Sequence, residues 1–119
     1  MGMIIHTAIV VTGSKEERES DGKWTYDHLE ELRAYAYTLG LDASELVEAK
    51  TNAYASFMIA TDGSKLGWET NNEAEEARNK FKKALEDWHY PIEWVEVRYG
   101  FDADRGPSVR AGTAHGEER

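Results

Sequence analysis

The sequence of 119 residues contains no cysteine and only two prolines. Without cysteine the chain can form neither disulfides, nor thiolate nucleophiles, nor cysteine-ligated metal sites, and this composition fits a reducing compartment. Basic residues are also scarce, since 14 Lys and Arg stand against 23 Asp and Glu, giving a formal net charge of −9. Because affinity for nucleic acids comes mainly from Lys and Arg, a nucleic-acid partner is not expected.

Long hydrophobic runs are missing from the chain. The apolar segment 3–11 is interrupted by His6 and Thr7 and is too short to span a membrane. It has neither a basic leading region nor a small-residue cleavage site, so it differs from a signal peptide. We therefore expect a cytoplasmic protein without membrane association, and a chain of this length fits one domain.

The first third of the chain predicts a strand, a loop and a helix. Residues 4–12 are rich in β-branched side chains on both alternating faces, which is typical of a central strand. Residues 13–23 are charged, contain two glycines and predict a mobile loop. Asp27 and Glu30 have the spacing of a capping box, and Gly40 supplies a left-handed stop. The apolar stripe of this helix comprises Leu29, Leu32, Ala36 and Leu39.

The middle of the chain predicts a hairpin. Residues 46–51 form either a short second strand or part of a helix that opens within residues 42–45. We favour the strand, because residues 51–53 have the composition of a tight connection to the strand 54–61. In that strand the apolar residues Ala55, Phe57 and Ile59 alternate with other side chains.

A second helix and a last strand follow. Asn72 has the position of a helix cap with Glu75 three residues later, and Pro91 ends the helical region. The buried stripe of the helix comprises Ala74, Ala77, Phe81, Ala84, Leu85 and Trp88. Alternation resumes over residues 92–101 as a strand. Residues 102–119 have almost no apolar side chains, so we expect a single domain over residues 1–101 and a flexible tail over residues 102–119.

The order strand, helix, strand, strand, helix, strand predicts an α+β fold. Short connections and right-handed crossovers favour a ferredoxin-like βαββαβ two-layer sandwich, with a four-stranded antiparallel sheet and both helices on one face. We expect the helices to cover the side of Phe57, Ile59, Val95 and Val97. The other face would then present Tyr54, Ser56, Met58, Trp94, Glu96 and Arg98.

Three segments resemble a known group of proteins. The string NAYASFMIATDGSKLGW ends at Trp68, the string NNEAE precedes Arg78 and Phe81, and WVEVRYG begins at Trp94. Together they resemble a group of small uncharacterised proteins encoded by bacteriophages and prophages, over about residues 6–100. The resemblance implies the same order of strands and helices in a protein acting inside the host bacterial cell. It supplies no catalytic or ligand residues.

Residues suited to catalysis do not form a recognisable motif. The histidines at positions 6, 28, 89 and 115 lack the spacing of metal ligands, so no metal site or cofactor is expected. The segment 12–15 lacks the upstream glycine of a phosphate loop. Carboxylates at Asp62, Glu69 and Glu73 surround Ser64, but no base and orienting group stand at a suitable spacing. We therefore expect a protein that is not an enzyme. A minor enzyme of unknown reaction is an alternative to the binding functions considered below.

The candidate binding residues are a turn and a sheet face. The turn after residue 61 projects Ser64, Lys65 and Trp68. The sheet face adds Tyr54, Met58, Trp94 and Arg98.

Exposed tryptophan and tyrosine are typical anchors of interfaces. We therefore predict a phage or prophage accessory protein that binds a host protein and interferes with a host process or defence system. A homodimer through Tyr54, Met58 and Trp94 is also predicted. The alternative is an oligomeric protein that sequesters a nucleotide-like ligand between Trp68, Trp94, Lys65 and Arg98.

Overall fold

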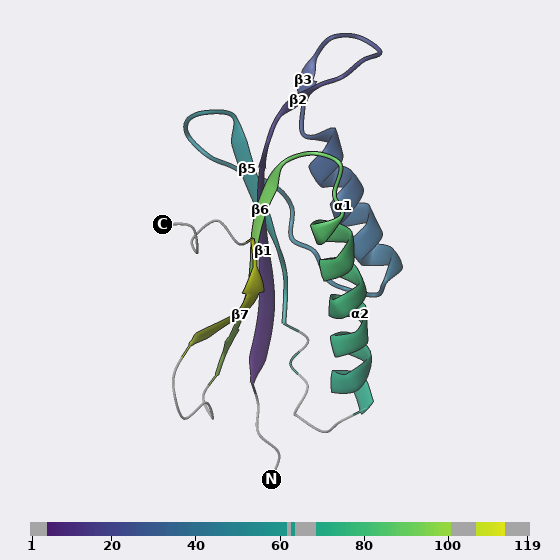
Figure 1. Ribbon diagram of the computed structural model, residues 1–119, viewed down its shortest axis with the longest axis vertical. Coiled ribbons are helices and arrows are strands. Elements are labelled where there is room, and N and C mark those ends of the chain that lie inside the picture. Colours follow the sequence, from purple (N-terminus) through teal and green to yellow (C-terminus); the bar gives the residue numbers. More distant parts are fainter. Residues whose placement is uncertain (1–4, 62, 64–68, 101–106, 114–119) are drawn as a thin grey trace.

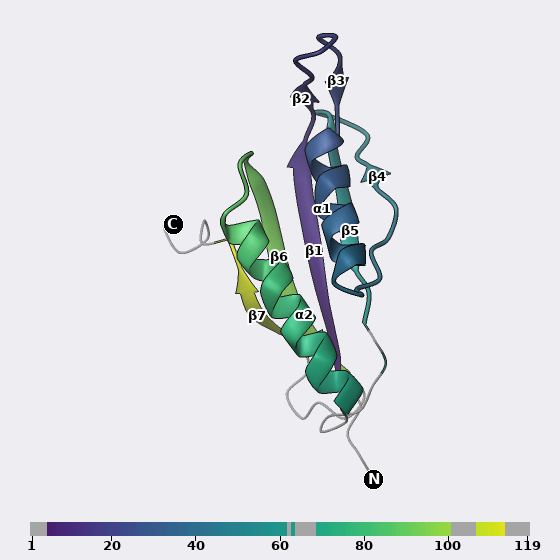
Figure 2. The ribbon, with the colours of Figure 1, turned by 90° about the vertical axis from the view of Figure 1, so that its right-hand side faces the viewer.

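The computed structural model describes residues 5–61, 63, 69–100 and 107–113. One layer is an antiparallel sheet with the strand order β4-β5-β1-β6-β7. The strands are β1 (His6–Ser14), β4 (Val47–Glu48), β5 (Tyr54–Ile59), β6 (Ile92–Tyr99) and β7 (Ser108–Gly112). The second layer consists of the helices α1 (Asp27–Thr38) and α2 (Glu69–Glu86), which lie on the same face of the sheet (Figure 1 and Figure 2).

The α+β class with two helices is confirmed, but the expected four-stranded ferredoxin-like βαββαβ sandwich is wrong. A fifth strand, β7, pairs with β6. The strands β2 (Glu16–Glu17) and β3 (Trp24–Thr25) form a separate hairpin in the segment expected to be a mobile loop. Gly22 allows the chain to reverse there, because glycine adopts a φ of +71° without the steric cost that a side chain adds.

Helix α1 begins at Asp27, but not through the expected capping box. Tyr26 occupies the cap position and makes no side-chain capping bond. The Asp27 carboxylate instead accepts hydrogen bonds from Arg18, at 2.8 Å from Nε and 3.0 Å from Nη2. These bonds hold the pKa of Asp27 below its ordinary value. The stop at Gly40 is confirmed by its φ of +81°.

Helix α2 begins at Glu69, three residues before the expected cap at Asn72. An acidic residue in the first turn suits the positive end of the helix dipole. Phe81 and Leu85 are buried as expected, whereas burial of the charged Arg78 was not expected. Within the described part of the chain, neither helix is long and apolar enough to cross a membrane.

The predicted hairpin of β4 and β5 is confirmed. Val47 pairs with Ser56 and Glu48 with Ala55. Between the strands, Asn52 and Ala53 have φ values of 63° and 54°. Consecutive left-handed residues match the right-handed twist of paired strands, which explains how the turn closes with a non-glycine sequence.

The helix-facing side of β6 is the opposite of the predicted one. Ile9 and Val11 of β1 pair with Glu96 and Trp94, and all four side chains are buried. Val95 and Val97 therefore face away from the helices. Because side chains alternate along a strand, burial of Glu96 on the helix side places every second residue of β6 on that side and the others on the opposite face.

The core lies between the sheet and the two helices. Its fully buried members come from β1, α1, β5, α2 and β6, and include Ile9, Val11, Leu29, Leu32, Phe57, Ile59 and Phe81. Gly13 allows α1 to approach β1, because a Cβ at this position would lie 3.0 Å from Leu29 Cδ2 and 3.1 Å from His28 Cε1. This packing is the structural reason for the glycine that precedes Ser14 and Lys15.

The prediction of a flexible tail is wrong over residues 107–113. There β7 pairs with β6, with Ala111 opposite Glu96 and Val109 opposite Val97, so that Arg110 forms a bulge. A Cβ at position 112 would lie 2.8 Å from the carbonyl oxygen of Trp94, so only glycine fits the pairing. The rest of the predicted tail lies outside the described residues.

Candidate functional site

The helices leave one face of the sheet uncovered (Figure 1). On this side Val10 stands between Met58 of β5 and Val95 of β6, and Val97 stands beside Val109 of β7. We call this surface the open face. It comprises His6, Ala8, Val10, Thr12, Ser14, Val47, Tyr54, Ser56, Met58, Glu93, Val95, Val97, Tyr99 and Val109.

Large apolar side chains on the open face are accessible to solvent. Val10 and Met58, at its centre, are 36% and 37% exposed, and Val109 is 70% exposed. Tyr54 and Tyr99 are exposed at opposite ends. Besides His6, the described residues of β1, β5 and β6 place one acidic or basic side chain on this side of the sheet. This side chain is Glu93. In a chain of formal charge −9, such a face is unusually free of charge.

The polar groups near the centre of the open face satisfy one another. The hydroxyls of Thr12 and Ser56, on adjacent strands, lie 2.7 Å apart in a hydrogen bond. An apolar partner can therefore cover this pair, because the two hydroxyls stay hydrogen-bonded to each other.

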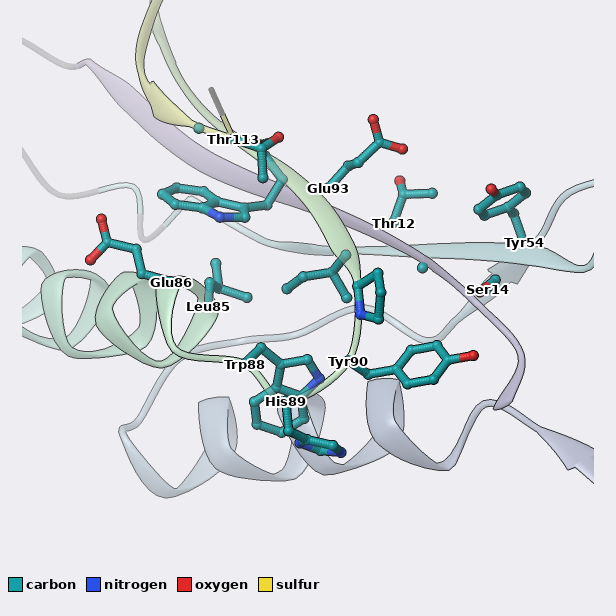
Figure 3. Close-up of a pocket in the computed structure, with 15 residues that line it drawn as sticks. Thr12, Ser14, Tyr54, Leu85, Glu86, Trp88, His89, Tyr90, Glu93 and Thr113 are labelled. Atoms are coloured by element: carbon teal, nitrogen blue, oxygen red, sulfur yellow. Dashed lines mark hydrogen bonds between the residues drawn. The ribbon is translucent and has the colours of Figure 1, made fainter. Parts of the chain in front are cut away.

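A cleft adjoins the open face where α2 passes into β6 (Figure 3). It has a volume of about 850 Å³. Its walls include the aromatic residues Trp88, Tyr90 and Trp94 and the carboxylates of Glu86 and Glu93. We call it the terminal cleft.

A buried histidine fixes two of the aromatic walls. Trp88 Nε1 donates to His28 Nδ1 over 3.3 Å, and His28 Nε2 lies 2.7 Å from the carbonyl oxygen of Ser14. Because an indole nitrogen only donates, His28 Nδ1 must accept, so Nε2 carries the hydrogen and donates to Ser14. The ring of Tyr90 packs on His28 with centroids 4.6 Å apart, and its hydroxyl donates to the Lys15 carbonyl oxygen over 3.3 Å.

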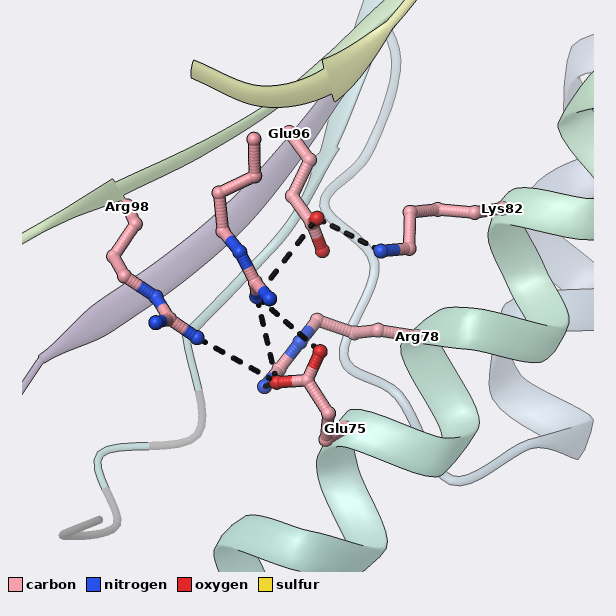
Figure 4. A network of polar contacts seen from close by, with 6 residues as sticks. Glu75, Arg78, Lys82, Glu96 and Arg98 are labelled. Carbon is pink, nitrogen blue, oxygen red and sulfur yellow. Dashed lines mark hydrogen bonds and ion pairs between the residues drawn. The ribbon is translucent and has the colours of Figure 1, made fainter. Parts of the chain in front are cut away.

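A cluster of ion pairs joins α2, β6 and β7 (Figure 4). It comprises Glu75, Arg78, Lys82, Glu96, Arg98 and Arg110. The fully buried Glu96 accepts a hydrogen bond from Lys82 Nζ over 2.8 Å. We call this set the ion-pair cluster, and its position between three elements indicates a structural role.

Glu75 is the second carboxylate of the ion-pair cluster. It lies 3.2 Å from Arg78 Nη2 and 3.2 Å from Arg110 Nη1, and 3.8 Å from Arg98 Nη2. Partial burial raises the pKa of Glu75, but the charges and hydrogen bonds of Arg110 and Arg78 outweigh burial. The pKa of Glu75 is consequently lower than its ordinary value.

The structure separates the residues predicted to bind. Tyr54 and Met58 lie on the open face, as expected. Trp94 is buried beneath the helices, with 7% of its surface exposed, and Arg98 pairs with Glu75 on that same side. The predicted dimer surface and the predicted nucleotide-like site therefore do not assemble with these members. Ser64, Lys65 and Trp68 lie outside the described residues.

The terminal cleft was not predicted from the sequence. Its clearest signal is local, because Trp88, His89 and Tyr90 are consecutive and precede Pro91. The sequence gives no such signal for His28 and Ser14, because they support the cleft through contacts between segments that are distant in sequence. Over the described ranges, no group of three or more His, Cys, Asp or Glu residues is arranged to hold a metal ion.

Comparison with known proteins gives two matches, and each is partial. The chain is similar to leucine aminopeptidase 2 of Aspergillus fumigatus and of Neosartorya fischeri, with 32% identity to each over 93 residues. The similar segment covers 78% of this chain, and the chain spans about 15% of the length of these curated relatives. No protein-family model and no solved structure matches the chain.

Proposed function

We propose that this protein acts by binding another protein, without catalysing a reaction, and that the open face is its binding surface. One observation carries the proposal: the helices cover one side of the sheet (Figure 1), while the other side exposes apolar residues around Val10. Contiguous exposed apolar surface of this kind is typical of sites of protein interaction.

The composition of the open face supports this proposal. Its centre is apolar, and its two exposed tyrosines are residues that often dominate the energy of an interface. Charged residues are depleted at the centres of interfaces, as they are here. A rigid sheet also presents these side chains with little loss of conformational entropy on binding.

The proposed target is a protein of a bacterial host. This part of the proposal is supported by a resemblance to phage- and prophage-encoded proteins, which rests on the motifs ending at Trp68 and beginning at Trp94. An accessory protein of this kind would act in the host cytoplasm by interfering with a host process or defence system.

Affinity capture with matched variants tests the proposal. Val10→Glu and Met58→Glu each place a charge at the centre of the open face, whereas Ala34→Glu places the same charge on an exposed part of α1. The original chain and Ala34→Glu should capture the same bacterial protein, and the two open-face variants should lose it. The captured protein, once purified, should show the same order of affinities by titration calorimetry.

The melting temperatures of all variants are measured alongside. If a bacterial protein binds the original chain and the open-face variants equally well, the open face is not its binding surface. If no bacterial protein binds the stable original chain, the proposed function is wrong.

A leucine aminopeptidase activity is the second candidate, favoured by the 32% identity to those enzymes. Release of nitroaniline from leucine 4-nitroanilide by the purified protein would support it. No release, in a preparation that retains its fold, would reject it.

A further inference from the structure

We propose that the terminal cleft binds a lysine or arginine side chain of the protein that covers the open face. This inference rests on the proposed function, because it concerns the chemistry of the same partner. The residues that carry it are the aromatic Trp88, Tyr90 and Trp94 and the carboxylates Glu86 and Glu93 (Figure 3).

The charge of the cleft selects for a cation. Glu86 and Glu93 line it, and no Lys or Arg is among its lining residues. Both carboxylates are exposed, and within the described part of the chain neither forms an ion pair. Glu86 is also the last residue of α2, where the helix dipole disfavours a negative charge. A bound cation would offset that unfavourable position.

Trp88 and Tyr90 offer the cleft their rings rather than their polar atoms. The indole N–H of Trp88 is bonded to His28, and the hydroxyl of Tyr90 is bonded to the carbonyl of Lys15. What remains for a ligand is the ring surface, which attracts ammonium and guanidinium groups and packs against their alkyl stems. An anionic ligand such as a nucleotide would find two carboxylates here and neither lysine nor arginine.

The walls are held in place before a ligand arrives. His28 is completely buried and connects Ser14 of β1 to Trp88, while Tyr90 packs against its ring. Two aromatic side chains are thus fixed by one neutral histidine. A site fixed in advance loses less entropy when it binds.

The cleft and the open face share residues. Thr12, Ser14, Tyr54 and Glu93 line the cleft and also point to the open side of the sheet. One partner can therefore cover the apolar centre and place a basic side chain in the cleft. The volume of about 850 Å³ exceeds that of a single side chain, so neighbouring residues of the partner fit as well.

The test is a nuclear magnetic resonance titration of the full chain with three probes. These are the peptide acetyl-Gly-Lys-Gly-amide, the same peptide with its lysine ammonium acetylated, and the free amine spermidine. The lysine peptide should shift the indole N–H signals of Trp88 and Trp94 in a saturable manner. The acetylated peptide should bind at least about tenfold more weakly, because the cation is lost.

Variants of the carboxylates provide the second arm. Glu86→Gln with Glu93→Gln should weaken the lysine peptide about tenfold, while Glu31→Gln on the exposed part of α1 should leave its affinity unchanged. Equal binding of both peptides, no binding at millimolar concentration, or no effect of the double variant would each overturn the inference. Tighter binding of spermidine than of the lysine peptide would overturn it too, because the cleft would then be a site for free amines.

Failure here is distinguishable from failure of the proposed function. If capture of a bacterial protein depends on Val10 while the lysine peptide does not bind, the open face remains the binding surface and only the inference about the cleft is wrong. If the lysine peptide binds the cleft but capture is independent of Val10, the role of the open face is wrong and the preference of the cleft for cations stands.

Discussion

Replacing Lys82 by methionine should destabilise the protein by about 3 kcal/mol, the lower end of the range for breaking a buried ion pair. Lys82 Nζ lies 2.8 Å from Oε1 of Glu96, whose side chain is fully buried. Methionine keeps an unbranched side chain of similar length, so packing changes little while the ammonium group is lost. The carboxylate of Glu96 would then remain buried without its closest cation.

The expected magnitude follows from what remains around Glu96. Arg110 Nη1 is 3.9 Å from Oε1 and makes no hydrogen bond to it. At an effective dielectric constant of about 20, that separation still contributes roughly 4 kcal/mol of attraction, which keeps the loss from reaching the top of the range. In the Lys82→Met background, Glu96→Gln should recover at least half of the loss, because an amide leaves no buried charge.

Urea denaturation followed by tryptophan fluorescence measures these changes. Lys83→Met is the matched control, since Lys83 is the next residue of α2 and is exposed, and its cost should stay within about 0.5 kcal/mol. A loss below about 1 kcal/mol for Lys82→Met, or strict additivity of the two substitutions, would refute the role assigned to the buried pair.

Four further outcomes are expected. Phe81→Ala should cost about 3–5 kcal/mol in a urea melt, because Phe81 is fully buried between the helices and the sheet; a cost below about 1 kcal/mol would contradict this packing. Gly112→Ala should speed amide exchange in β7, because its Cβ would meet the carbonyl of Trp94; unchanged exchange would contradict the close approach. Ionised Glu75 stabilises the fold at neutral pH, and this contribution should disappear as the pH falls from 4.5 through the lower folded pKa; Glu75→Gln should flatten that part of the stability curve in urea melts, and a steeper curve would contradict the sign. Because the open face is proposed to bind a different protein, the original chain should give a monomer mass by light scattering; a dimer mass that Val10→Glu reduces to a monomer mass would show that a second copy covers the open face instead.

Features of the fold with a local cause were predictable from the sequence. The stripe of α1, its stop at Gly40 and the hairpin before Tyr54 each depend on residues within one turn or one strand pair. The strand β7 was missed because Val109 is the one large apolar residue of SVRAG, and the segment gains its place by pairing with β6. The face of β6 was inverted because Lys82 and Arg110, distant in sequence, make burial of Glu96 acceptable.

The candidate site was predictable to a smaller extent. Tyr54 and Met58 follow from the alternation of β5 and lie on the open face. Trp94 and Arg98 were assigned to the same face through the error in β6. The terminal cleft depends on His28 meeting Trp88 and Tyr90, and no pattern along the chain indicates that these rings meet.

The central position of β1 has a consequence for synthesis on the ribosome. This strand precedes the other strands of its sheet in sequence, yet it pairs with β5 on one side and with β6 on the other, as far as His6 with Tyr99. Contacts so distant in sequence slow folding, and β1 has no neighbour in its sheet until β5 has emerged and one neighbour until β6 has emerged. Until then the unpaired edges of β1 can associate with other chains. The nascent protein should therefore depend on chaperones more strongly than its small size suggests.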